Sequence, residues 1–121
     1  MTPRAITQRE LAVLRATLER AGKVQLDADL LERLENLRVV GWCDCGCDRV
    51  DFVEDDPQRP SRPNADGTGK TAAGGDVGII IWGNDDGVTE MEIFDLGAGE
   101  GDIRLPVEGS IRPWPANRSG V

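Results

Sequence analysis

The chain has 121 residues, a formal net charge of −8, and a composition with 39% hydrophobic but only 4% aromatic residues. This length suits one domain with a small aliphatic core, and the sequence has no apolar run of about 18 residues that could span a membrane. The negative charge repels phosphate groups, so direct binding to nucleic acid is not expected.

The charge is divided unevenly along the chain. Residues 1–40 carry a net charge of +1, whereas residues 41–121 carry −9. The N-terminal stretch has no apolar segment typical of a secretory signal. The three cysteines lie too close together for an ordinary disulfide framework. These features favour a cytoplasmic protein with reduced thiols, whose second part attracts basic partners.

Two helices are predicted in the first forty residues. Thr7 and Glu10 have the spacing of a capping box, and a stripe of leucines at helical spacing follows them, which predicts a helix over residues 7–21. A second leucine stripe with charged residues opposite predicts a helix over residues 28–37.

After these helices the apolar pattern changes to the period of two that is typical of strands. It predicts one pair of strands over about 38–44 and 48–54, and a second pair over about 77–83 and 88–95. Residues 55–76 contain three prolines, four glycines and no large apolar residue, so they are expected to form a mobile loop.

The predicted fold is therefore a single α+β domain over residues 1–110. Its two N-terminal helices pack on a roughly four-stranded antiparallel sheet, with the long loop between the two hairpins. "IRLPV" is a candidate short edge strand that ends at Pro106. Residues 111–121 form a proline-rich tail in which Trp114 lies between two prolines.

The segment "CDCGC" places Cys43, Cys45 and Cys47 at every second position. Three thiols favour zinc, with Asp44 or Asp48 as a further ligand, and a zinc-stabilised module is one alternative. In a flat strand, however, these sulfurs lie about 7 Å apart, and the chain has no histidine. The neighbouring aspartates also disfavour a reactive thiolate. The main prediction is a tight turn without metal or other cofactor, in which the cysteines act as small apolar side chains.

Two further motifs are judged to be chance matches. "GTGKT" resembles a phosphate-binding loop, but Asn64 stands where the first glycine is required. "NADG" resembles a calcium loop, but Arg62 and Ala73 replace the first and last acidic ligands.

The acidic residues of the last predicted hairpin and its neighbours are the strongest remaining signal. Glu90 and Glu92 alternate with apolar residues and so share one face of a strand, and Asp85 and Asp86 lie in the turn before them. Carboxylates on a solvent-facing strand, without histidine, tyrosine or a nucleophile motif, do not favour an enzyme. An ordinary solvated face is the alternative explanation of this acidity.

The motifs "WCDCGCDRVDF", "TEMEIF" and "IRLP" resemble those of small, mostly uncharacterised bacterial proteins. In those proteins a C-x-C-G-C run leads into a strand, and a later strand precedes a Leu-Pro pair. The resemblance covers residues 38–106 and carries over no catalytic residue. In size, acidity and strand content the chain is also similar to toxin-immunity proteins and to phage-encoded, anti-CRISPR-like inhibitors of bacterial defence.

Together these observations predict a non-enzymatic acidic protein that binds and inhibits a partner protein with a basic site. The expected contact residues are Asp51, Asp85, Asp86, Glu90 and Glu92, with Trp82 and Trp114 as candidate anchors. An accessory subunit of a larger assembly is a further alternative.

Overall fold

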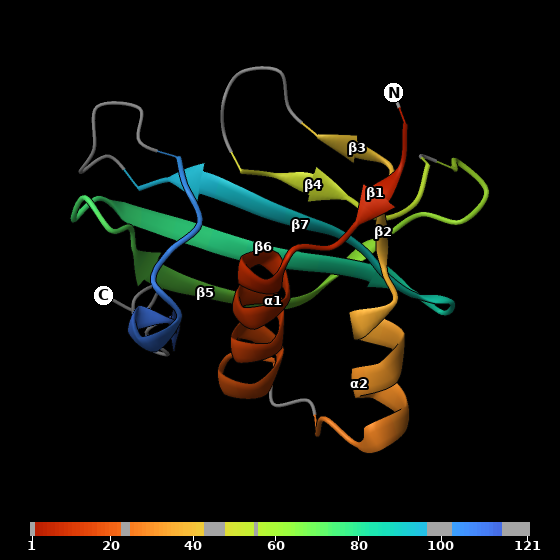
Figure 1. The fold of residues 1–121 in the computed structure, drawn as a ribbon, viewed down its shortest axis with the longest axis horizontal. Coiled ribbons are helices and arrows are strands. Elements are labelled where there is room, and N and C mark those ends of the chain that lie inside the picture. The colour runs from red at the N-terminus through yellow and green to blue at the C-terminus, as the bar shows by residue number, and fades with distance from the viewer. Residues whose placement is uncertain (1, 23–24, 43–47, 55, 97–102, 115–121) are drawn as a thin grey trace.

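The computed structural model of the chain describes residues 2–22, 25–42, 48–54, 56–96 and 103–114. Figure 1 shows its elements in chain order. They are β1 (Arg4–Ala5), α1 (Gln8–Arg20), α2 (Ala28–Glu35), β2 (Arg38–Val39), β3 (Gly41–Trp42), β4 (Val50–Asp51), β5 (Arg62–Lys70), β6 (Asp76–Asn84), β7 (Gly87–Asp95), the 3-10 helix η1 (Glu108–Ser110) and β8 (Arg112–Pro113).

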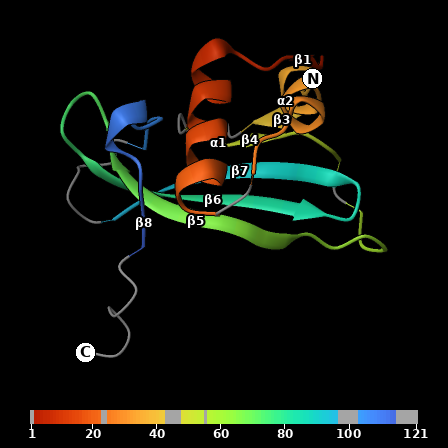
Figure 2. The same ribbon diagram turned by 90° about the horizontal axis from the view of Figure 1, so that it is seen from below.

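The fold is α+β with antiparallel strand pairing, as predicted. Six strands form one sheet in the order β3-β4-β7-β6-β5-β8, and β1 pairs with β2 in a separate two-stranded sheet. Both α-helices lie on the same side of the large sheet (Figure 2), and α1 contacts β5, β6 and β8. The opposite face of the sheet carries no helix of the described chain; we call it the open face.

The prediction of four strands with a mobile loop over residues 55–76 is wrong. Residues 62–70 form β5, a nine-residue strand that pairs with β6 along almost its whole length. Its glycines are needed because other segments pack directly on them. A Cβ at Gly67 would lie 2.6 Å from the carbonyl oxygen of Arg112, and one at Gly69 would lie 2.7 Å from Pro106. Glycine here marks close packing of one segment on a strand.

Other boundaries differ from prediction more modestly. The predicted strand over 38–44 is divided between β2 in the small sheet and β3 in the large one, and that over 48–54 reduces to the two residues of β4. Residues 103–107 form no strand. The predicted tail contributes β8, which pairs with β5, and Ile111 is part of the core.

Helix α1 begins at the predicted capping box. The Glu10 amide donates to the Thr7 hydroxyl, and the Thr7 amide donates to the Glu10 carboxylate. Arg4 of β1 also donates two hydrogen bonds to this carboxylate, at 2.9 and 2.8 Å. Burial raises the pKa of Glu10, but the hydrogen bonds from Arg4 and Thr7 outweigh it and hold the pKa below its ordinary value. Glu10 therefore fixes β1 to the start of α1.

Glu10→Gln is expected to lower the free energy of unfolding by about 1–2 kcal/mol at neutral pH, because it removes the charge from a bidentate pair. The folded-state pKa of Glu10 is lowered, so its contribution is present above the ordinary carboxyl pKa and is lost as the pH falls through the folded value. Urea unfolding of wild type and Glu10→Gln at neutral pH and at about pH 3 measures the contribution of Glu10. The two free energies of unfolding should differ less at the lower pH. Glu19→Gln, at an exposed position of α1, is the control. A difference that stayed constant with pH would contradict the assignment.

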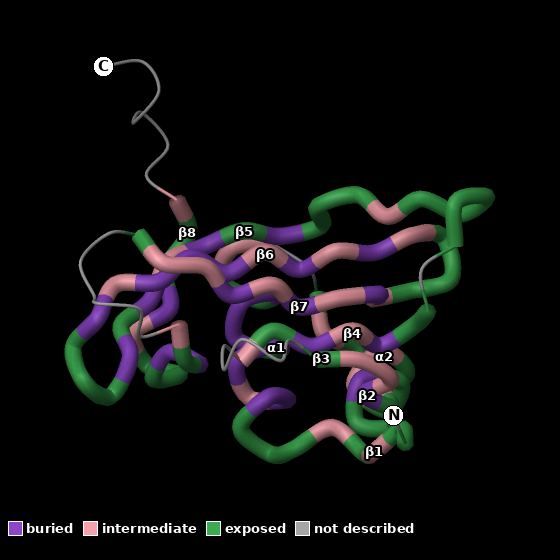
Figure 3. Tube along the Cα trace, turned by 90° about the horizontal axis from the view of Figure 1, so that it is seen from above, coloured by how far each residue is buried: buried purple, intermediate pink, exposed green. Residues whose placement is uncertain are grey.

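Strands β6 and β7 separate the core from the open face by an alternation of buried and partly buried residues that is interrupted at Gly78 (Figure 3). Val77, Ile79 and Ile81 of β6 and Met91 and Ile93 of β7 are buried on the helix side. Ile80, Trp82, Glu90, Glu92 and Phe94 alternate with them on the open face and are only partly buried, whereas Gly78 is buried beneath the Phe94 ring. The predicted alternation therefore places both glutamates on the face that no helix covers.

An aromatic pair occupies one end of the open face. The Phe94 ring lies over Gly78, where a Cβ would be only 2.2 Å from the ring. Trp114 stacks on Phe94 with ring centroids 6.3 Å apart. This stacking fixes Trp114, the residue after β8, to the sheet. Trp114 therefore has a structural role at this end of the open face.

Candidate functional site

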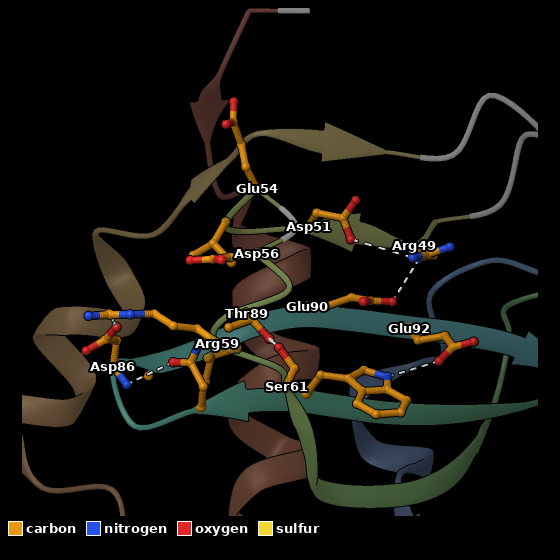
Figure 4. A pocket seen from close by; sticks show the side chains of 15 residues that line it. Arg49, Asp51, Glu54, Asp56, Arg59, Ser61, Asp86, Thr89, Glu90 and Glu92 are labelled. Atoms are coloured by element: carbon orange, nitrogen blue, oxygen red, sulfur yellow. Dashed lines mark hydrogen bonds and ion pairs between the residues drawn. The ribbon is translucent and has the colours of Figure 1, made fainter.

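A pocket of about 800 Å³ lies at the other end of the open face. The sheet side of its wall comes from Arg49 and Asp51 at β4 and from Trp82, Glu90 and Glu92 on β6 and β7. The rest comes from the segment over residues 53–61 and from the turn between β6 and β7 (Figure 4). We call this cavity the acidic pocket, because six carboxylates and two arginines line it: Asp51, Glu54, Asp56, Asp86, Glu90 and Glu92, with Arg49 and Arg59.

Most of the predicted contact residues meet in this pocket. Asp51, Glu90 and Trp82 are neighbours because β4 and β6 pair with β7 on either side, with Asp51 opposite Glu90 and Glu90 opposite Trp82. Glu92 and Asp86 also line the cavity. Asp85, in the turn, is exposed but does not line it, and Trp114 stacks on Phe94 instead.

Arg49 pairs with two of these carboxylates at the rim (Figure 4). Its Nε lies 2.9 Å from Glu90 Oε2, and its Nη2 lies 3.8 Å from Asp51 Oδ1. Burial raises the pKa of Glu90; Arg49 lowers it, while the nearby Asp51 and Glu92 carboxylates raise it again. The pKa of Glu90 is above its ordinary value, first because the carboxylate is partly buried and then because Asp51 and Glu92 lie nearby; the ion pair with Arg49 only partly offsets these effects.

A second arginine pairs with the turn at the opposite rim. Arg59 Nη1 contacts Asp86 Oδ2, and the Asp86 amide donates to Asn84 Oδ1 at 2.8 Å. Gly87 completes the turn with a φ of 129°, a value that strongly favours glycine. These contacts hold the segment that contains Arg59 against the tip of the β6–β7 hairpin.

A β-bulge shapes the floor of the pocket. The pairing between β6 and β7 shifts at Trp82 and Gly83, so that Glu90 and Val88 have partners in β6 but Thr89 has none. The buried Thr89 hydroxyl lies 2.6 Å from the Ser61 hydroxyl. Because a bulge redirects side chains, Thr89 and the adjacent Glu90 both line the cavity. Neither residue was predicted from the sequence: Ser61 lies in the segment expected to be a mobile loop, and Thr89 reaches the cavity only through the register shift.

Trp82 is held in a fixed orientation beside these carboxylates. Its indole Nε1–H donates to Glu92 Oε1 at 3.0 Å, and the residue is half-buried. The ring therefore offers the pocket wall an aromatic surface that does not need to be ordered on binding.

Three carboxylates of the pocket form no salt bridge with a described residue, although Glu92 is close enough to Arg49 to raise the pKa of its guanidinium. Glu54, Asp56 and Glu92 make none of the salt bridges found there; Asp56 accepts a hydrogen bond from the Gln58 amide, and Glu92 accepts one from Trp82. With every group ionised, six carboxylates and two guanidinium groups give the pocket a net charge of −4. Arrangement and charge together suit a cationic ligand.

The three candidate zinc ligands, Cys43, Cys45 and Cys47, lie outside the described residues. Within the described ranges, no group of three or more histidine, cysteine, aspartate or glutamate side chains is arranged to hold a metal ion. The carboxylate of Asp48 accepts a hydrogen bond from the Leu105 amide at 2.7 Å and lies 3.7 Å from Arg104 Nη1.

The first four residues of "GTGKT" are the end of β5, and Thr71 follows the strand. The backbone of Gly67–Lys70 is therefore extended and paired with β6. This geometry differs from a phosphate-binding loop, which the sequence analysis had already rejected. Neither helix in the described part of the chain is long and apolar enough to cross a membrane.

Comparison of the chain with models of protein families, with characterised proteins and with solved structures finds no match.

Proposed function

We propose that this chain is a non-enzymatic binding protein that docks its open face on a basic surface of a partner protein and thereby blocks that surface. The observation that carries the proposal is the convergence of six carboxylates and Trp82 in one pocket, on a sheet face that no described helix covers. A sheet is a rigid platform, so these groups are positioned before the partner arrives.

The charge of this face determines what kind of partner it attracts. The pocket carries a surplus of four negative charges and belongs to a chain with a net charge of −8. Such a field accelerates encounter with a cationic surface and repels nucleic acid. A protein surface that itself binds nucleic acid has the complementary charge. An immunity protein or an inhibitor of bacterial defence, located in the cytoplasm, would meet such a surface.

Trp82 supplies the apolar part of the contact. Charged rims chiefly set the rate and orientation of association, whereas partly buried aromatic residues often dominate the contact energy. In this chain Trp82 lies directly beside Glu90 in the sheet and is hydrogen-bonded to Glu92. A basic side chain that enters the pocket would thus meet carboxylates and an aromatic ring together.

The test is a fluorescence titration of the whole chain with octa-arginine as a defined basic probe, over a series of salt concentrations. Saturable binding is expected, and the Kd should rise at least about tenfold between about 50 and 300 mM salt, because ions screen the charges involved. An octa-glutamate peptide is the control and should not bind. Absence of binding to octa-arginine at low salt, or binding that salt does not weaken, would contradict the proposal.

A further inference from the structure

Arg49 pairs with carboxylates of the acidic pocket so loosely that an incoming cation could take its place. Its side chain is 44% exposed and lies at the rim, with only Glu90 at hydrogen-bonding distance; the approach to Asp51 is 3.8 Å. With one hydrogen bond to Glu90 and a longer approach to Asp51, most N–H donors of the guanidinium group make no hydrogen bond to these carboxylates. Ion pairs this exposed contribute little to stability, so exchanging one cation for another costs little.

The carboxylates around Arg49 attract more positive charge than it provides. Glu90 is flanked by Asp51 across one strand pair and shares its strand face with Glu92. Its pKa is raised by burial and by these two neighbours even with Arg49 in place. Three carboxylates thus lie around one guanidinium, and this excess of negative charge attracts a second guanidinium or a better placed one.

The neighbouring ring favours arginine over lysine as the group that enters. Trp82 lies opposite Glu90 in the sheet, and its indole is fixed by Glu92. A guanidinium group is planar, weakly hydrated and able to stack on an aromatic ring while it donates to carboxylates, whereas an ammonium group acts as a strongly hydrated point charge.

We infer that the acidic pocket is a guanidinium site, and that Arg49 holds in the unbound chain the place that an arginine of the partner takes on docking. This inference rests on the proposed function and names the group that the open face recognises. Arg49 is then an internal competitor: it pairs with Glu90 and lies near Asp51 until a partner displaces it. Removing Arg49 should therefore strengthen binding.

The experiment compares Arg49→Gln with Arg33→Gln, using the full chain and octa-arginine at low salt. Arg33 is a matched control, because it pairs with Asp29 at 2.6 Å on α2, away from the open face. Each substitution removes one positive charge; Arg49→Gln frees Glu90 and the more distant Asp51, and Arg33→Gln frees Asp29. We expect Arg49→Gln to lower the Kd about fivefold relative to Arg33→Gln, with a smaller gain for octa-lysine. Arg49→Lys should fall between wild type and Arg49→Gln.

Circular dichroism establishes that each variant is folded, and Arg49→Lys carries the comparison if Arg49→Gln is not. An affinity of Arg49→Gln that is weaker than that of wild type, or within about twofold of Arg33→Gln, would overturn the inference. If wild type binds in a salt-dependent manner while that gain is absent, the inference alone fails. If neither wild type nor any variant binds octa-arginine, the proposed function fails with it.

Discussion

Leu14→Ala is expected to lower the free energy of unfolding by about 3 kcal/mol, the largest effect of any single change considered for this chain. Leu14 is fully buried in the middle of α1, the helix that packs on β5 and β6. Removing this side chain leaves a cavity between helix and sheet. The surrounding structure can relax only partly, so the cavity does not close. Urea unfolding followed by circular dichroism measures the change.

Arg15→Ala is the matched control for this prediction, since Arg15 is the next residue of the same helix and is exposed. It should change the stability by less than about 0.5 kcal/mol. A loss below about 1 kcal/mol for Leu14→Ala would mean that α1 does not form the core with the sheet.

Reversing two charges on the open face, Glu90→Lys with Glu92→Lys, is expected to weaken binding of octa-arginine by about 30-fold or more. The double variant changes the charge of the pocket wall from −4 to neutral by formal count and removes the carboxylate that orients Trp82. The electrostatic attraction of the pocket for arginine is thus lost, and the Trp82 ring is no longer held in place by Glu92. The same titration at low salt measures the effect.

The control for net charge is Glu32→Lys with Glu35→Lys on α2, where both side chains are exposed. These substitutions change the charge of the whole chain equally but lie on the helix side of the sheet. They should weaken binding less than about threefold. Equal losses for the two double variants would show that only net charge matters and that the open face has no special role.

The β6–β7 hairpin was predictable because its sequence pattern is decided locally. An apolar run and an alternating strand flank a turn that ends at Gly87, and each feature indicates the same structure. The capping box of α1 is equally local, since Thr7 and Glu10 satisfy each other's backbone groups.

Strand β5 could not be predicted in this way because it has no large apolar side chains. Its pairing with β6 and the segments that pack on it stabilise it instead. Ala65, Gly67 and Gly69 face inward and are small, so that α1 and the segment before β8 can approach closely. A period of two is present in "ADGTGK", but without large apolar residues it does not distinguish a strand from a glycine-rich loop.

Four of the six carboxylates of the pocket were predicted, whereas Glu54, Asp56, Arg59 and the floor were not. Glu90 and Glu92 follow from alternation, and Arg49 alternates with Asp51 in "RVD", a signal that the two share a face. Arg59 and Ser61 reach the pocket only because the segment over residues 56–61 folds against the β6–β7 turn. The bulge at Thr89 depends on the register between two strands, which no local pattern specifies.

The most direct test of the central claim follows the three tryptophan indole resonances by NMR while octa-arginine is added at low salt. The resonances of Trp42, Trp82 and Trp114 are assigned by replacing each residue with phenylalanine. We predict that the Trp82 Nε1–H resonance shifts most, since its bond to Glu92 lies in the pocket wall. A Trp82 resonance that stays in place while the peptide binds elsewhere would contradict the assignment of the open face as the docking surface.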